Sequence, residues 1–281
     1  MKLSCQEGLA PGSTFAEKIR NLEKYGFEGV ELNGGALNDP AGLAERKAAL
    51  RDSPVKASSI CGGCPAELIH ADAKRRQACA DALKKHLDYA AELGAVGPIT
   101  VPIFNGNERV PDLSPWKSRA EIEKELLLAM LRSLAPHAEQ AGAVILLEPL
   151  NRYEANCLPR QKDGAEIVRA IGSPGVRLMS DVFHMHIEEP SSPATLREVG
   201  DCIAHVHLAD NTRKEPGTGD IDFRAIMAAL REAGFTGYMA FECGLSGPAE
   251  EVLPRSVAFL KKCMGGASEA EEPRVSPFDE G

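Results

Sequence analysis

The sequence has little that would place the protein in a membrane or on nucleic acid. No apolar run is long enough to span a bilayer, and the opening MKLSCQEGLAPGS lacks the apolar stretch of a signal peptide. We therefore expect a cytoplasmic protein without a membrane partner. Lys and Arg total 32 against 41 Asp and Glu, a formal net charge of −9. A field of that sign repels phosphate backbones, so we expect no nucleic-acid partner.

Aromatic residues and paired cysteines are also scarce. Aromatics make up 5% of the 281 residues, so the core must be largely aliphatic. Among the eight cysteines, Cys61 and Cys64 alone have a metal or redox spacing, and a zinc ribbon would need a second such pair. We interpret these two as reduced thiols in a glycine-rich loop. No glycine-rich dinucleotide fingerprint follows the first apolar run, where CQEG leads toward PGS.

The chain is rich instead in short apolar runs that alternate with stretches of helical period. Eight runs have the length of buried strands, at 3–6, 29–32, 55–60, 99–104, 144–148, 176–181, 203–208 and 238–242. This alternation predicts a parallel sheet covered by helices. Eight units in one chain favour a closed (β/α)8 barrel, the TIM-barrel class of α/β folds, over an open doubly wound sheet.

Local patterns predict helix faces, a helix start and the domain limits. One helix should bury Cys79, Leu83, Leu87 and Ala90, and another should bury Ile122, Leu126, Met130 and Leu134. Ser13 is the expected cap of the first helix. We expect a single catalytic barrel domain over 1–264. The acidic segment 265–281 has no apolar period and two prolines, which predicts a disordered or loosely docked tail.

Four late strands each end on a side chain that can bind a metal: Glu148, Asp181, His207 and Glu242. Successive members lie 33, 26 and 35 residues apart, close to the spacing of about 30 expected for one βα unit of a barrel. The carboxyl ends of barrel strands share one rim, so the four side chains should meet. Three carboxylates at one place repel one another unless a cation is bound. The pattern therefore predicts one divalent metal ion held by these four residues.

The ligand set also indicates the chemistry. Oxygen-rich sites suit Mn²⁺, Mg²⁺ and Co²⁺, whereas structural zinc sites are rich in sulfur. Mn²⁺ is our first choice, and Zn²⁺ stays a candidate. Glu148 and Glu242 should lie roughly 135° apart around a regular barrel, on opposite sides of a substrate. One carboxylate can then remove a proton while the other returns it to the opposite face, which is epimerisation. His205 should point inward one layer below His207.

Five segments resemble the xylose isomerase-like barrels: GFEGVELNGG at 26–35, EPLNRYE at 148–154, DVFHMHIEE at 181–189, HVHLADNTRKEPGTGDIDF at 205–223 and AFE at 240–242. Within that family the chain looks most like the sugar isomerase/epimerase branch that includes D-tagatose and D-psicose 3-epimerases. The resemblance extends over nearly the whole chain to about residue 264. Glu31 belongs to the first of these segments.

The resemblance implies roles that spacing alone leaves open. The same four residues would hold the metal, with Glu148 and Glu242 as the acid/base pair of C3 epimerisation of a ketose through a cis-enediolate. Glu154, His184 and Arg213 would bind the sugar; from the residues alone, Arg213 is equally well explained as a surface ion pair. The partner would be a small carbohydrate. Relatives are often dimers or tetramers, so the resemblance implies a homodimer or a homotetramer. Which sugar is bound, and whether it is phosphorylated, stays open.

Other activities occur on the same type of barrel. Keto-inositol dehydratases and lyases that cleave carbon–glycoside bonds also use metal-assisted enolisation, and a lyase or dehydratase stays an alternative. His207 counts against a hydroxypyruvate isomerase, and the complete Glu148 and Glu242 pair counts against a sugar sensor without catalysis. An endonuclease IV-like DNA-repair enzyme would need extra histidines from early strands, which here end in ELN at 31–33 and SIC at 59–61.

Overall fold

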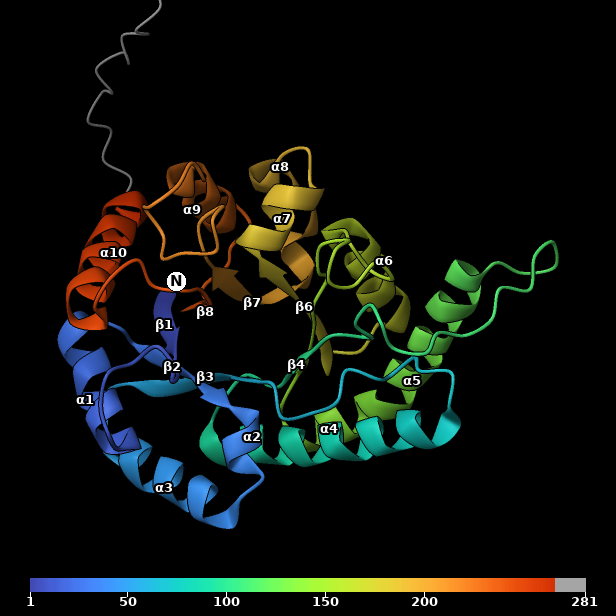
Figure 1. Ribbon diagram of the computed structural model, residues 1–281, viewed down its shortest axis with the longest axis horizontal. Coiled ribbons are helices and arrows are strands. Elements are labelled where there is room, and N and C mark those ends of the chain that lie inside the picture. Colours follow the sequence, from blue (N-terminus) through green and yellow to red (C-terminus); the bar gives the residue numbers. More distant parts are fainter. Residues whose placement is uncertain (266–281) are drawn as a thin grey trace, which may run out of the picture.

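Residues 1–265 are described by the computed structural model, in which parallel strands surround a central axis and helices cover the outside (Figure 1). The strands are β1 (Lys2–Gln6), β2 (Gly29–Asn33), β3 (Lys56–Cys61), β4 (Ile99–Thr100), β5 (Ile145–Leu147), β6 (Val176–Asp181), β7 (Ile203–Leu208) and β8 (Tyr238–Phe241). The expected tail lies outside the described residues except for Gly265. Within 1–265, no helix combines the length and apolar character needed to cross a membrane.

The strand order is β3-β2-β1-β8-β7-β6-β5-β4, with every pairing parallel. The two ends of this order meet at an isolated bridge between Ile60 and Pro98, where the Ile60 N–H donates to the Gly97 carbonyl at 3.0 Å. The eight strands therefore form a nearly closed barrel, which confirms the predicted fold class.

Helices follow the strands and pack around the barrel (Figure 1). They are α1 (Phe15–Tyr25), α2 (Gly34–Leu37), α3 (Pro40–Arg51), α4 (Ala73–Leu93), α5 (Arg119–Ala141), α6 (Gln161–Ile171), α7 (Val182–Glu188), α8 (Ser192–Val199), a 3₁₀ turn η1 (Gly200–Cys202), α9 (Phe223–Glu232) and α10 (Ala249–Met264). The expected face of α4 is confirmed, because Cys79, Leu83, Leu87 and Ala90 are buried.

The start of α1 lies one residue later than expected. Thr14, not Ser13, is the N-cap: its hydroxyl accepts from the Glu17 N–H at 3.2 Å, and the Glu17 carboxylate accepts from the Thr14 N–H in return. The Ser13 hydroxyl donates to the same carboxylate at 2.5 Å. Ser13 therefore supports the capping box from outside the helix, and its assignment as the cap is wrong.

The buried face of α5 also differs from the prediction. The side chains against the barrel lie mostly one position further along the helix: Glu123, Leu127, Leu131 and, as expected, Leu134. Ile122, Leu126 and Met130 are only half-buried. The segment LLLAML at 126–131 carries apolar residues at neighbouring positions, so periodicity alone fits two adjacent faces.

Strand β4 is shorter than its apolar run. The run continues to residue 104, but the strand ends at Thr100. Pro98 and Pro102 flank it, and proline has no N–H to donate to a neighbouring strand. Beyond Thr100 the chain leaves the sheet, so the mouth of the barrel next to β4 is lined by a loop.

One layer of the barrel interior is polar. The Ser4 hydroxyl from β1 lies 2.7 Å from that of Ser58 on β3, and both side chains are fully buried. Ser59, Glu31 and His205 lie in the same interior and are also buried. Buried polar groups need internal partners, so this layer is a hydrogen-bonded support beneath the carboxyl ends of the strands.

Candidate metal centre

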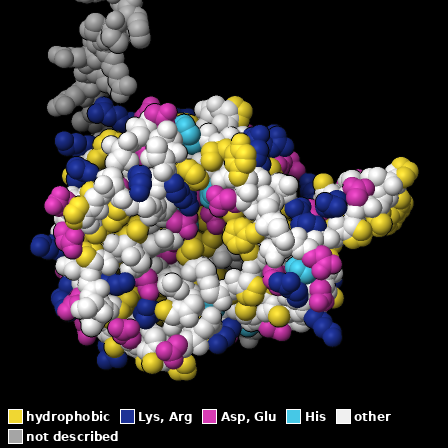
Figure 2. Space-filling view, viewed as in Figure 1, with side chains coloured by type: hydrophobic (Ala, Val, Ile, Leu, Met, Phe, Trp, Pro, Cys, Tyr) yellow, Lys and Arg dark blue, Asp and Glu magenta, His cyan; other side chains and the backbone are white. Residues whose placement is uncertain are grey.

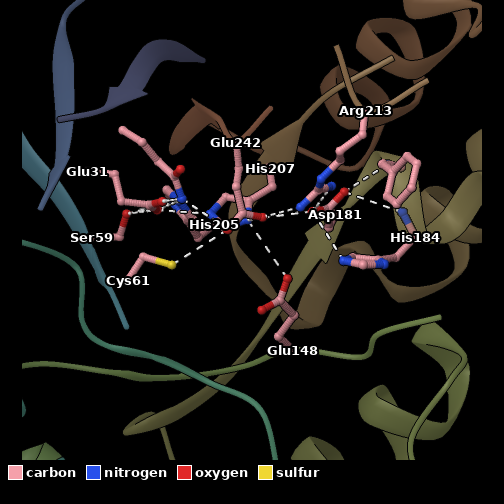
Figure 3. Close-up of polar contacts among 12 residues, drawn as sticks. Glu31, Ser59, Cys61, Glu148, Asp181, His184, His205, His207, Arg213 and Glu242 are labelled. Atoms are coloured by element: carbon pink, nitrogen blue, oxygen red, sulfur yellow. Dashed lines mark hydrogen bonds and ion pairs between the residues drawn. The ribbon is translucent and has the colours of Figure 1, made fainter. Parts of the chain in front are cut away.

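The four predicted metal ligands converge at the carboxyl ends of consecutive strands (Figure 3). Asp181 ends β6 and His207 lies near the end of β7, while Glu148 and Glu242 directly follow β5 and β8. One ligand atom from each lies within 4.8 Å of the others. The parallel register explains this convergence, because Asp181 pairs with His207 and His207 pairs with Ala240, two residues before Glu242.

Two atoms in this cluster are buried without a hydrogen bond. Glu148 Oε1 and His207 Nδ1 have no partner among the described residues, although both are shielded from solvent. Buried polar atoms are rarely left unpaired, and exceptions often mark a missing ion or water. Both atoms belong to the set that can hold a metal. Three carboxylates and one imidazole, with two such unpaired atoms, fit a divalent cation that prefers oxygen and nitrogen ligands.

The electrostatics of the cluster point the same way. Burial raises the pKa of Glu148 well above its ordinary value. The charge of His207 opposes this shift, whereas the charges of Glu242 and Asp181 add to it. Burial would lower the pKa of His207, but the carboxylates of Glu242 and Glu31 hold it well above its ordinary value. Negative charge is therefore in excess here, and a cation would relieve it.

Arg213 lies at the rim of this cluster, not on the outer surface. Its Nη1 lies 2.7 Å from Asp181 Oδ2, its Nη2 contacts Glu242 Oε2, and its guanidinium stacks on the Phe183 ring. The backbone of Arg213 is left-handed, with φ of 56°, which is uncommon for a side chain of this size. The alternative of an ordinary surface ion pair is wrong.

A buried aspartate that sequence reasoning missed shapes the loop that carries Arg213. The Asp210 carboxylate accepts hydrogen bonds from four backbone N–H groups of that loop, at 2.9–3.2 Å: Asn211, Gly217, Thr218 and Ile221. The Arg213 N–H also donates to the Asp210 carbonyl at 2.8 Å. An aspartate just after a strand and before a glycine-containing loop is the signal that could have indicated this role.

The other two predicted substrate-binding residues lie beside Arg213. His184 Nε2 is 3.7 Å from Asp181 Oδ2, and His184 Nδ1 accepts from the Asn151 N–H at 3.3 Å. The Asn151 amide also donates to Glu154 Oε1 at 2.9 Å, so Asn151 links the two predicted residues. Asn151 follows β5 within the segment EPLNRYE, but its linking role could not be read from spacing.

One pocket joins these residues. It has a volume of about 180 Å³, and its lining includes Glu148, Glu242, Glu154, His184 and Arg213. In the space-filling view, acidic and histidine side chains come to the surface around a hollow near the centre of the face (Figure 2). A pocket of this size suits a small molecule whose polar groups meet charged side chains on one side.

Another part of the pocket lining comes from the ends of β3 and β4 and the loops that follow them. It carries Thr100, Phe104 and the thiols of Cys61 and Cys64. The Thr100 hydroxyl is buried and has no hydrogen-bond partner within residues 1–265. Because it lines the pocket, it is available to a polar group of a bound molecule. Sequence reasoning did not single out Thr100, since one threonine in a strand has no distinguishing pattern.

Cys64 is part of an array that superficially resembles a nucleophile with its base. Its Sγ lies 3.0 Å from His86 Nδ1, and His86 Nε2 lies 3.2 Å from Asn38 Oδ1. However, burial raises the pKa of Cys64 to about 12 and lowers that of His86 to about 4. Both groups are therefore neutral near pH 7, and an activated thiolate is not formed. Cys61 and Cys64 are free thiols, as we interpreted them, but Cys61 ends β3 and only Cys64 lies in the loop.

Beneath the four ligands lies an inner layer that sequence reasoning described only in part. His205 was expected there, and its Nε2 lies 3.1 Å from Glu31 Oε2. Gln6 was missed: its amide donates to Glu31 Oε1 and to Glu242 Oε1, both at 3.0 Å. Burial would raise the pKa of Glu31, but the imidazoles of His207 and His205 hold it well below its ordinary value.

Known proteins resemble this chain over most of its length. The model of the xylose isomerase-like TIM barrel family matches residues 19–263. The 3-dehydro-D-guloside 4-epimerase of Escherichia coli (strain K12) is 30% identical over 267 residues, covering 94% of this chain and 100% of that protein. A D-psicose 3-epimerase of Enterocloster bolteae is 29% identical over 258 residues, covering 84% and 78%.

The solved structures include one with both a similar fold and appreciable identity. The apo crystal structure of 3-keto-D-glucoside 4-epimerase from E. coli has a TM-score of 0.84 and 28% identity. The match covers 94% of this chain and 100% of that one. The two chains therefore share one fold over nearly their full lengths.

Proposed function

This chain belongs to the xylose isomerase-like TIM barrel family, and we propose that it is a divalent-metal-dependent epimerase of a keto-sugar. It is an isomerase-type enzyme, as its relatives are. The names of those relatives describe inversion at C4 of a 3-keto sugar and at C3 of a 2-keto sugar. In both cases the inverted carbon is adjacent to the carbonyl, and we propose the same relationship here, with C3 of a ketose as the first candidate.

The observation that carries this proposal is the pair of carboxylates around one metal-capable cluster. Glu148 and Glu242 follow β5 and β8, and the ends of β6 and β7 lie between them. This separation supports roles on opposite faces of one substrate carbon. Both line the same pocket, so both can reach a bound sugar.

A divalent ion held by Glu148, Asp181, His207 and Glu242, with Mn²⁺ the first candidate and Mg²⁺, Co²⁺ or Zn²⁺ the others, would stabilise the negative charge that develops on the carbonyl oxygen. One of the two glutamates takes the proton from the carbon beside the carbonyl, which leaves an enediolate. The other glutamate, in its acid form, returns a proton to the opposite face. After one inversion the first glutamate carries a proton and the second does not, which is the state needed for the reverse reaction. Proton exchange with solvent restores the starting state for another forward turnover.

The sugar itself is held, in this proposal, by Arg213, His184 and Glu154. Arg213 and His184 bind around the carbonyl side, close to Asp181, which both contact. Glu154 binds the neighbouring hydroxyl end and relays protons there. All three line the pocket with the two catalytic glutamates, and this shared location supports their assignment.

A direct test uses solvent deuterium. The metal-loaded protein is incubated in D₂O with free ketohexoses, ketopentoses and 3-keto-glycosides, and the products are identified by NMR. We expect inversion of the carbon beside the carbonyl in at least one compound, with deuterium at that carbon. Expulsion of water or cleavage of a glycoside in place of inversion would favour the dehydratase or lyase alternative. The absence of any exchange at carbon would contradict the proposal.

A further inference from the structure

The two ring nitrogens of His207 face two different acidic groups (Figure 3). On one side, Nδ1 faces the proposed metal ligands and lies 2.9 Å from Glu242 Oε2. On the other side, Nε2 lies 2.9 Å from Glu31 Oε2. Both His207 and Glu31 are fully buried side chains. The imidazole therefore lies between the metal cluster and the Glu31 carboxylate below it, and its two contacts fix the orientation of the ring.

Glu31 is surrounded by hydrogen-bond donors. The Ser59 hydroxyl donates to Oε2 at 2.6 Å, and the Gln6 amide donates to Oε1 at 3.0 Å. The Nε2 atoms of His205 and His207 lie 3.1 and 2.9 Å from Oε2. An ionised carboxylate has about four acceptor sites and no hydrogen to donate. A proton on Nε2 of His207 makes its contact with Oε2 a hydrogen bond, whereas a lone pair there would face the carboxylate oxygen.

We propose that Glu31 is a positioning residue for the metal site, which holds His207 in the tautomer that presents the Nδ1 lone pair to the ion. This inference rests on the proposed metal-dependent function. A carboxylate behind a metal-bound histidine fixes the ring orientation and makes the ligand more basic. The unpaired Nδ1 in the metal cluster is the counterpart of the proton held on Nε2.

Glu31 also acts on a second ligand through Gln6. The Gln6 amide bridges Glu31 Oε1 and Glu242 Oε1 at 3.0 Å each. This contact occupies Oε1 of Glu242 and turns Oε2 toward His207 Nδ1, where Arg213 also contacts it. Glu31 therefore orients two of the four ligands, one directly and one through an amide.

The same residues could be interpreted as a second metal site, because Glu31, His205 and His207 also form a group with metal-ligand geometry. The donors from Ser59 and Gln6 argue against this interpretation. Together with the two imidazoles they place three donors around Oε2, the oxygen nearest both histidines, and one on Oε1. The two interpretations differ in the number of ions per chain, which is measurable.

The test compares metal affinity among matched variants by calorimetric titration of the metal-stripped protein with Mn²⁺. For Glu31→Gln we expect one ion per chain and a Kd about 10–100-fold higher than that of the wild type. Glu123→Gln is the control, since it also removes a buried carboxylate: Glu123 lies on α5 and pairs with Arg109, and neither residue belongs to the metal cluster. Its Kd for Mn²⁺ should equal that of the wild type.

A spectroscopic measurement separates positioning from a general loss of stability. In the Zn²⁺-loaded wild type, long-range ¹H–¹⁵N spectra should show His207 protonated on Nε2, and Glu31→Gln should show a mixture of ring states. If Glu31→Gln does not fold, Ser59→Ala decides, because it removes one donor to Glu31 and should raise the Kd several-fold.

Wild-type affinity in both Glu31→Gln and Ser59→Ala would overturn the inference, as would two ions per wild-type chain and one in Glu31→Gln. If the wild type itself binds no divalent ion, the proposed function fails instead.

Discussion

Glu148 Oε1 lies 3.8 Å from His207 Nδ1, and both atoms are buried without a hydrogen bond in the described part of the chain. Two buried polar atoms that face the same small space without hydrogen bonds are costly unless a cation there binds both. The glutamate comes from the end of β5 and the histidine from β7, so the relationship exists only in the closed barrel. It is the most direct structural support for a bound cation.

The first prediction concerns the ion. The purified protein should carry about one divalent ion per chain, and chelation should abolish an activity that Mn²⁺ or Co²⁺ restores. Asp181→Ala and His207→Ala should each weaken metal binding by more than the roughly 100-fold that loss of an outer hydrogen-bond partner can cause. Elemental analysis and titration measure both effects. Full activity after verified removal of the ion would contradict the prediction.

The second prediction concerns the two glutamates. Glu148→Gln and Glu242→Gln should each reduce epimerisation at least about 100-fold, because acid–base catalysis contributes about that much or more. One of the two variants should still wash deuterium into its own substrate, since the surviving carboxylate can remove and return a proton on one face. Metal content must be matched by adding saturating Mn²⁺. Equal inversion by both variants and the wild type would exclude the two-base mechanism.

The third prediction separates sugar binding from metal binding. Arg213→Ala and His184→Ala should retain the ion but reduce kcat/KM by about 10–100-fold, the value of a lost hydrogen bond to a charged group. Arg152→Ala is the matched control, because Arg152 follows the same strand as Glu154 but pairs with Glu188 and is 58% exposed. Its kcat/KM should match the wild type. A comparable loss in the control would indicate a general effect of loop charge.

The fourth prediction tests the loop support beneath Arg213. Asp210→Asn replaces an acceptor of four backbone hydrogen bonds with an amide that opposes some of those donors. We expect kcat/KM to fall, as it should for Arg213→Ala. The free energy of unfolding should fall by about 1–3 kcal/mol. Asp220→Asn on the same loop is the control, since Asp220 is exposed. Wild-type kinetics for Asp210→Asn would show that the loop holds Arg213 without it.

The fifth prediction concerns stability against pH. Burial lowers the pKa of His86 to about 4, whereas an unfolded histidine has a pKa near 6.5. The unfolded chain therefore binds a proton more readily between these values, and the free energy of unfolding should fall by about 3 kcal/mol as pH drops from 6.5 to 4. Urea denaturation of metal-free wild type and His86→Gln at several pH values isolates this contribution. Parallel curves for the two proteins would refute it.

The fold could be predicted because each βα unit carries its own local signal. Strand-length apolar runs and helical periods recur eight times, and parallel strands in a barrel end at one rim by geometry. That is why residues as far apart as Glu148 and Glu242 could be placed together from their positions along the chain. Because successive βα units have similar lengths, the position of a residue along the chain indicates where it lies around the rim of the barrel.

Other features depended on neighbours that no local pattern records. Gln6 and Glu242 are 236 residues apart, and their contact exists because β1 and β8 pair when the barrel closes. The support of His207 by Glu31, the loop held by Asp210 and the face of α5 were likewise decided by packing. The sequence by itself determined the repeated units and the types of side chain at their ends. The tertiary structure decided which lone pairs face one another, because that depends on closure of the sheet, not on periodicity.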